Sequence, residues 1–251
     1  MLAKLKTECG EFSFGRKWIF QTLLSVAAAY VHLESFKVLW ADASIGEFVV
    51  YSLTNKNYFL ILFPFLCLAW TNGKSQEVCR YPLLVRYRTG NEFFAVRFLA
   101  KALFSMAALL AHIGALLIVG RTLASVPRNC FVTSGHPAGI IILQFLNLSC
   151  YVCVVLLLYE LLSNVVGNTM LGVMLTALEV IMNHLVVGLG MTPIIMWTPW
   201  GRVAYKLSGQ TVLNYRFYVI YWAFLISLLF YLADKWNGRK DYVFEETRKT
   251  G

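Results

Sequence analysis

The chain has 251 residues, of which 59% are hydrophobic and 14% charged, and its formal net charge is +9. Soluble domains are roughly 45–50% apolar and about 25% charged, so this composition excludes a soluble enzyme, a disordered tail and a secreted disulfide scaffold. The apolar residues gather in runs of about 20, the length at which a helix crosses the roughly 30 Å hydrocarbon core of a bilayer. We therefore expect an all-α integral membrane protein with a single polytopic transmembrane domain.

Six apolar runs are expected to form the transmembrane helices. In chain order, they cover residues 18–37, 49–70, 94–119, 139–162, 169–191 and 217–233. The second run is interrupted by Thr54, Asn55, Lys56 and Asn57, so this helix could begin only at Tyr58, which would make it short.

The Lys and Arg residues orient these six helices, because cytoplasmic loops of membrane proteins carry an excess of both. Fifteen lie in or near three segments: the N-terminal segment 1–17, the loop 71–93 with Arg97 and Lys101 just beyond it, and the C-terminal tail 234–251. Six or seven lie on the opposite side. Both termini are therefore expected in the cytoplasm. Because no basic tract is interleaved with aromatic residues, no nucleic-acid partner is expected.

The loop 71–93, between the second and third helices, is the longest and most basic of the expected cytoplasmic connections. Val78, Tyr81, Leu84 and Val85 recur at near-helical spacing among charged residues, and Pro82 limits the helix before it to about one turn. An amphipathic segment of this kind either lies on anionic lipid headgroups or docks onto a cytoplasmic partner.

The outer loop 192–215, before the sixth helix, is long but not very polar. It contains Pro193 and Pro199 within apolar sequence. Such a sequence favours short helices that dip back into the membrane, where protein must cover the exposed backbone. We expect a re-entrant segment here.

Ionisable and polar groups inside the expected spans are candidates for a functional site, because charge at membrane depth costs about 2.5–3.5 kcal/mol. Glu179 is the most central of them. Together with Gly172, Thr176 and Asn183, it lies on one face of the fifth helix. This face either lines a transport path or subunit seam, or it packs on neighbouring helices with Glu179 protonated or hydrogen-bonded.

The other polar residues of the spans have simpler interpretations. Gln144, Asn147 and Tyr151 form a weaker stripe on the fourth helix, for which interhelical hydrogen bonding is a sufficient explanation. His112 is interpreted as a packing residue, and Glu160 as a residue near the membrane interface.

Catalytic and cofactor motifs are missing from the sequence. It contains no Ser/His/Asp set, no His-Glu-x-x-His and no G-x-x-x-x-G-K-S/T loop for ATP. Cys150 and Cys153 have a redox or zinc spacing, but no second ligand pair follows them and they lie in an apolar run. We expect no catalytic residue, no metal site and no cofactor bound by this chain.

The stretch Leu83-Leu84-Val85-Arg86-Tyr87-Arg88-Thr89 is similar to the basic "L-I-R-Y-K/R-S/T" stretch of small Gram-positive permeases that serve antimicrobial peptide export or immunity. Six spans, two inside termini, a helical inside loop and a re-entrant outer region also resemble the membrane subunit of an ABC-2-type transporter. One departure is the bulky fifth span, which has no counterpart to a substrate-binding motif.

This resemblance implies a permease subunit of an ATP-driven exporter in the bacterial plasma membrane, which moves a peptide or another amphipathic substrate. It implies a cytoplasmic P-loop ATPase as partner, which binds ATP and Mg²⁺, and a second membrane subunit, identical or different. The loop would act as a coupling helix in a groove of the ATPase. The coupling residues would be Glu77, Arg80, Tyr81, Leu84, Arg86, Tyr87 and Arg88.

Two alternatives stay open at this point. One is an intramembrane enzyme, a protease or a lipid-modifying enzyme, that uses Glu179 with Asn183 or His184. The other is a structural or immunity protein that binds its ligand without moving it.

Overall fold

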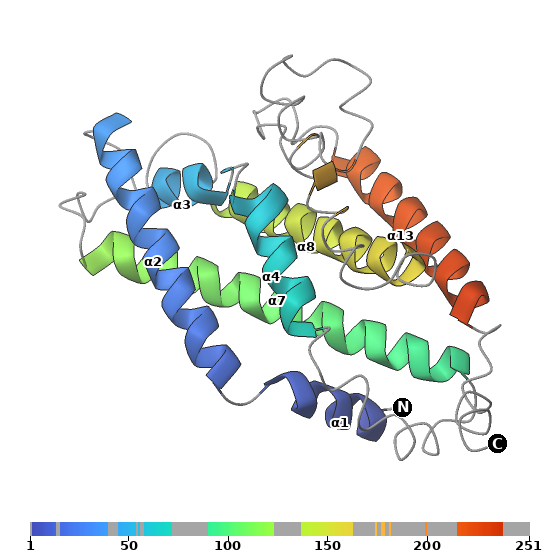
Figure 1. Ribbon diagram of the computed structural model, residues 1–251. Coiled ribbons are helices and arrows are strands. Elements are labelled where there is room, and N and C mark those ends of the chain that lie inside the picture. Colours follow the sequence, from blue (N-terminus) through green and yellow to red (C-terminus); the bar gives the residue numbers. More distant parts are fainter. Residues whose placement is uncertain are drawn as a thin grey trace.

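The computed structural model describes most of the expected helices (Figure 1). The residues it describes are 2–13, 16–39, 45–53, 55, 58–71, 90–122, 137–162, 174, 177, 178, 181, 199 and 215–237. All of these residues except Asn55 are helical, so the part of the chain that the structure describes is all-α, as expected.

Two helices occupy the first 39 residues. Helix α1 spans Leu2–Ser13 and helix α2 spans Arg16–Leu39. The sequence predicted α2 as the first span but treated 1–17 as a plain cytoplasmic segment. In the structure, most of that segment is α1.

The second expected span is broken into three short elements, at the interruption noted in the sequence. Helix α3 spans Ile45–Leu53, the π-helix η1 spans Tyr58–Leu62, and helix α4 spans Phe63–Thr71. Asn55 lies at the break, and its side-chain Oδ1 accepts a hydrogen bond of 3.0 Å from the backbone N–H of Tyr58, as a helix N-cap does. Pro64 lies in the first turn of α4, where its missing N–H is tolerated.

Three longer helices complete the described chain. Helix α7 spans Gly90–Thr122, α8 spans Pro137–Leu162 and α13 spans Tyr215–Asn237. Glu92 in the first turn of α7 and Arg121 in its last turn both suit the helix dipole. Pro137 starts α8, where its missing N–H would have had no helical partner.

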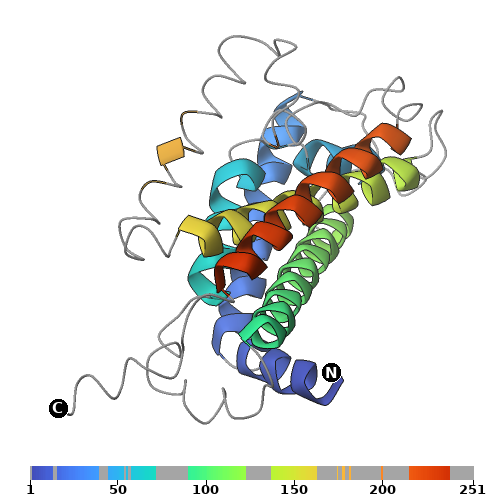
Figure 2. The same cartoon turned by 90° about the vertical axis from the view of Figure 1, so that its right-hand side faces the viewer.

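Helix α7 lies at the centre of the bundle. It contacts α1, α2, α3, α8 and α13, and α13 also runs against α8 (Figures 1 and 2). Helix α1 packs near the beginning of α7, and α3 packs near its end, where the ring of Phe48 approaches Gly120. One large hydrophobic core joins α2, α3, η1, α4, α7, α8 and α13.

The bundle places apolar side chains outside and many polar side chains inside. Large apolar residues are well exposed on the outer faces of four helices: Ile19, Leu23 and Val31 on α2, Ile118 on α7, Ile142 on α8, and Ile220 and Phe224 on α13. Lys101, Gln144, Asn147, His112 and Gln21 are all buried. A water-soluble domain, in contrast, rarely buries a charge and covers its large apolar patches.

Two described helices are long and apolar enough to cross a membrane, Asn91–Thr122 and Ile141–Leu162. They coincide with the third and fourth expected spans. Helices α2 and α13 cover the first and sixth expected spans. Of the fifth span, 169–191, the structure describes only residues 174, 177, 178 and 181, all helical.

Candidate functional site

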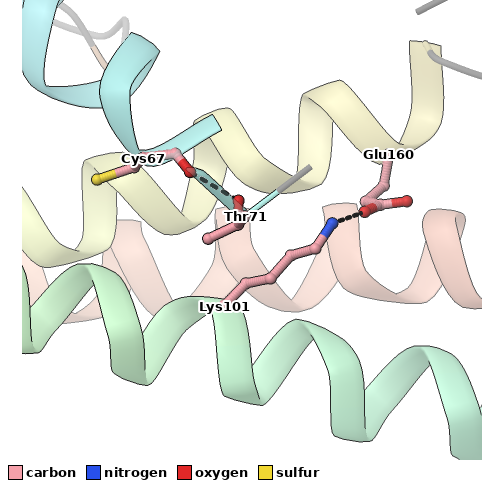
Figure 3. A network of polar contacts seen from close by, with 4 residues as sticks. All are labelled: Cys67, Thr71, Lys101 and Glu160. Carbon is pink, nitrogen blue, oxygen red and sulfur yellow. Dashed lines mark hydrogen bonds and ion pairs between the residues drawn. The ribbon is translucent and has the colours of Figure 1, made fainter. Parts of the chain in front are cut away.

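A buried ion pair joins α7 to α8 (Figure 3). The Lys101 ammonium donates a hydrogen bond to Glu160 Oε1, and the Lys101 side chain is only 1% exposed whereas that of Glu160 is 22% exposed. Thr71, at the end of α4, lies beside this pair, and its hydroxyl donates to the Cys67 carbonyl at 2.7 Å. Removing one partner of a buried pair leaves an uncompensated charge, so this contact fixes α7 and α8 to each other.

Two further charged groups act on Lys101. The Glu8 carboxylate of α1 attracts the Lys101 ammonium, and the Arg97 guanidinium, one helical turn away on α7, repels it. Glu8 is buried, at 1% exposed. The guanidinium of Arg97 lies over the ring of Phe93, 5.6 Å from its centroid. Glu8, Arg97, Lys101 and Glu160 are called the ionic cluster below.

Helix α1 is docked on α7 beside the ionic cluster. Leu5 and Cys9 of α1, together with Trp18 of α2, pack against Ala100 and Phe104 of α7. An ion pair of 2.6 Å between Lys4 and Glu92 adds a contact that is partly exposed to solvent. Burial and the neighbouring Glu8 carboxylate both raise the pKa of the Cys9 thiol, because each disfavours the thiolate.

A second buried cluster forms where the broken helix meets α2 and α7. His112 stacks on Tyr58 with ring centroids 4.8 Å apart, and its Nδ1 lies 3.5 Å from the Tyr58 hydroxyl. His32 of α2 meets both rings edge-on, at 5.6 Å from Tyr58 and 6.3 Å from His112. Among the residues that the structure describes, the buried atoms His32 Nδ1 and His112 Nε2 have no hydrogen-bond partner. His112 thus packs against the rings of Tyr58 and His32, but it is not a fully hydrogen-bonded packing residue, because its Nε2 lacks a described partner.

The polar stripe on α8 makes the interhelical hydrogen bonds that the sequence predicted. Gln144 Nε2 donates to the Leu53 carbonyl at the end of α3, at 3.1 Å. Trp222 Nε1 of α13 donates to Asn147 Oδ1, at 2.8 Å. Tyr151 is fully buried in the same core. Cys67 and Cys153 are buried free thiols, and Cys150 is a partly buried one, in line with their interpretation as small hydrophobic residues.

The site residues named from the sequence lie outside the described part of the chain. These are Glu77, Arg80, Tyr81, Leu84, Arg86, Tyr87 and Arg88 of the loop, and Gly172, Thr176, Glu179 and Asn183 of the fifth span. The re-entrant segment 192–215 and the tail 234–251 are described only at residues 199, 215 and 234–237.

Sequence reasoning missed the ionic cluster. Lys101 was counted among the orienting charges near the basic loop, and Glu160 was placed near the membrane interface. Lys101 is in fact buried, and Glu160 is bonded to it. A signal was present, since Lys101 lies inside the third expected span and Glu160 near the end of the fourth, but nothing in the sequence pairs two residues that are 59 positions apart.

Comparisons with known proteins add nothing to these contacts. Within the described ranges, no three His, Cys, Asp or Glu side chains come close enough to hold a metal ion. No protein-family model, curated protein or solved structure matches this chain.

Proposed function

We propose that this chain is the membrane subunit of an ATP-driven exporter of the ABC-2 type, in a bacterial plasma membrane. A separate P-loop ATPase binds ATP and Mg²⁺ and supplies the energy. A second membrane subunit completes the path for a peptide or another amphipathic substrate.

The distribution of polar and apolar side chains supports placement in a membrane. The outer faces of α2 and α13 expose Leu23 and Phe224 at 64% and 67%, whereas Lys101 is buried. Lipid tails and a second membrane subunit are surroundings in which such faces are stable. Charged residues within membrane spans face the bundle interior and pair with one another, as Lys101 and Glu160 do.

The position of α7 is the observation that carries the transport proposal. The expected coupling loop 71–93 leads directly into the first turn of α7, which begins at Gly90. With 33 residues, α7 is a rod about 50 Å long, and it contacts α1, α2, α3, α8 and α13. A force applied to the loop by an ATPase is therefore passed to a helix that touches most of the described bundle.

The first test is purification of the tagged chain from its native membranes, followed by identification of co-purified proteins. We expect a P-loop ATPase in the eluate, with Mg²⁺-dependent ATP hydrolysis. If the eluate contains no such ATPase, the proposal is wrong. Activity of the purified chain alone that disappears in Glu179→Gln would support the intramembrane enzyme instead.

The second test concerns the coupling loop. In inside-out vesicles that contain the complex, Glu77→Ala combined with Arg80→Ala should abolish ATP-driven uptake of a fluorescent amphipathic peptide. ATP hydrolysis and membrane insertion should remain, because the change removes the contact that transmits motion and leaves the spans intact. Arg121→Ala, at the other end of α7, is the matched control and should transport normally. Unchanged uptake in the double variant would remove the docking role from the loop.

A further inference from the structure

Two histidines and a tyrosine from three different elements meet in the buried core. His32 comes from α2, Tyr58 from η1 and His112 from α7. The ring centroid of His112 lies 4.8 Å from that of Tyr58 and 6.3 Å from that of His32, and the centroids of His32 and Tyr58 are 5.6 Å apart. Tyr58 is the first residue of the π-helix η1, and π-helical segments are rare and occur frequently at functional sites.

Each of the two imidazoles has a nitrogen atom with a free bonding position. His32 is 6% exposed and His112 is 0% exposed, so bulk water does not reach them. In the part of the chain that the structure describes, His32 Nδ1 and His112 Nε2 have no hydrogen-bond partner. A buried polar atom without a partner is destabilising. In a native structure, such an atom marks a position at which an ion or a water molecule can bind.

The Tyr58 hydroxyl decides which nitrogen of His112 is available to a ligand. Its oxygen lies 3.5 Å from His112 Nδ1. With the proton on Nδ1, this nitrogen donates to the hydroxyl oxygen, and Nε2 keeps its lone pair. Histidines that bind metals commonly use their second nitrogen in this way, because the donated hydrogen bond fixes the tautomer and the direction of the ring. The unpartnered Nε2 is then the ligand atom.

The spacing of the two imidazoles suits one ion between them. With metal–nitrogen bonds of about 2.0–2.1 Å, two imidazoles on the same ion have ring centroids up to about 6.5 Å apart. The separation of 6.3 Å between His32 and His112 is near this limit, so an ion bound to both lies close to the line that joins the rings. A near-linear pair of ligands is typical of Cu⁺.

Charge and ligand number also favour Cu⁺ over Zn²⁺. The ring of Phe59 lies 5.5 Å from His112, and that of Phe63 lies 6.2 Å from Tyr58. The cost of moving an ion into such apolar surroundings rises with the square of its charge, so a monovalent ion is favoured. Zn²⁺ usually takes four ligands, and no group of three His, Cys, Asp or Glu side chains forms within the described ranges. Imidazole is a suitable ligand for copper, and two imidazoles are enough for Cu⁺.

We propose that His32 Nδ1 and His112 Nε2 bind one Cu⁺ ion, and that Tyr58 is a positioning residue that orients His112. Both histidines bind as neutral imidazoles, so no proton or electron is transferred. The ion joins α2 to α7 beside the break in the second expected span. The sequence predicted no metal site, because two histidines on different helices form no motif. The site is a property of the single chain and does not depend on the proposed transport function.

The test counts the Cu⁺ ions that the full-length chain binds in lipid nanodiscs. The protein is purified without a histidine tag and kept anaerobic with ascorbate, and Cu⁺ is titrated in competition with the chelator bicinchoninate. His32→Phe and His112→Phe each keep a flat ring and remove the ligand nitrogen, so each variant should bind one Cu⁺ ion fewer per chain. Cysteines also bind Cu⁺, but they are the same in every variant and cancel in the difference.

Controls separate loss of the ligand from loss of the fold. The midpoint of thermal unfolding without metal shows whether each variant folds, and His32→Gln and His112→Gln form a second, more polar pair with the same expected loss of one ion. His136→Phe changes a histidine outside the described residues and should bind the full number of ions.

Tyr58→Phe tests the positioning role, because it keeps the stacked ring and removes only the hydroxyl. This variant should bind the full number of ions, but with an affinity about 10–100-fold weaker at this site, as is usual when a group that orients a metal ligand is removed. Tyr151→Phe removes the hydroxyl of another buried tyrosine and is the matched control. An unchanged affinity in Tyr58→Phe would show that its hydroxyl does not position His112.

Three other results would overturn the proposal. If folded variants of both histidines bind as many Cu⁺ ions as the unmodified chain, these nitrogens bind no Cu⁺. If only one of the two histidines is needed, the rings do not share an ion. If a parallel titration shows that the histidine variants lose a Zn²⁺ ion and no Cu⁺ ion, the site belongs to a different metal.

Discussion

Buried polar side chains act as connectors between helices in this bundle. Gln144 donates to the carbonyl of Leu53, the last residue of α3, whose oxygen has no partner within its own helix. Trp222 donates to Asn147 and so joins α13 to α8. Each connector satisfies a group that would otherwise be buried without a hydrogen bond, and this gives the apolar core a defined arrangement.

The bond between Trp222 and Asn147 can be tested by substitution. Asn147→Leu keeps the size of the side chain but leaves the buried indole N–H without its acceptor, at a cost of about 1–3 kcal/mol. We expect a clearly lower midpoint of thermal unfolding for the chain in detergent micelles, followed by intrinsic fluorescence.

An exposed bond supplies the control for this prediction. Asn91→Ala removes a hydrogen bond of 3.2 Å to Asp234 on the surface, where the expected change is within about 0.5 kcal/mol. Trp222→Phe combined with Asn147→Leu removes both polar groups and should be less destabilising than the sum of the single changes. Additive effects would mean that the two side chains are not coupled.

At the scale of elements, the sequence predicts where helices begin and end better than it predicts which helices pack against each other. Asn55 and Pro137 mark the starts of η1 and α8 by their chemistry alone, and the broken second span follows from the four polar residues around Asn55. The helix at α1 was missed because Leu2–Ser13 has little overall hydrophobicity and is held in place by α7. The pairing of Lys101 with Glu160 was missed because it depends on how α7 and α8 are aligned.

Substitutions at two glycines of α7, Gly114 and Gly120, can test how closely α3 approaches α7. A Cβ added at Gly114 meets nothing within 4 Å, whereas one added at Gly120 lies 3.1 and 3.3 Å from two ring carbons of Phe48. Gly114→Ala should therefore stabilise the chain by about 0.5–1 kcal/mol, because alanine loses less backbone entropy in a helix. Gly120→Ala should gain less than this, or lose stability, because Phe48 must shift.

A larger side chain should increase the difference in stability between substitutions at Gly120 and at Gly114. Gly120→Leu should destabilise the chain by about 1–3 kcal/mol through overpacking against α3, as measured by thermal unfolding. Gly114→Leu is the matched control, since the space around Gly114 is open. Equal midpoints for the two leucine variants would contradict the contact between α3 and α7 at this position.

At the scale of the whole molecule, several of the basic residues from which the orientation was predicted lie in the described helices. Lys4 and Lys6 on α1, with Arg97 and Lys101 on α7, lie toward the end of the bundle where α7 begins. Arg121 lies in the last turn of α7. By the positive-inside rule, we expect the end at which α7 begins to face the cytoplasm. The sequence alone supports this expectation, because it depends on where basic residues lie along the chain and not on contacts between helices.

Two native cysteines test this orientation without any engineered reporter. Cys79 lies in the expected cytoplasmic loop 71–93, and Cys130 lies in the expected outer connection between the third and fourth spans. A charged maleimide does not cross a bilayer, so in intact cells it should label Cys130 and leave Cys79 unlabelled. After the membrane is permeabilised, both should react. Labelling of Cys79 in intact cells, with Cys130 protected, would reverse the orientation and move the basic loop away from any cytoplasmic ATPase.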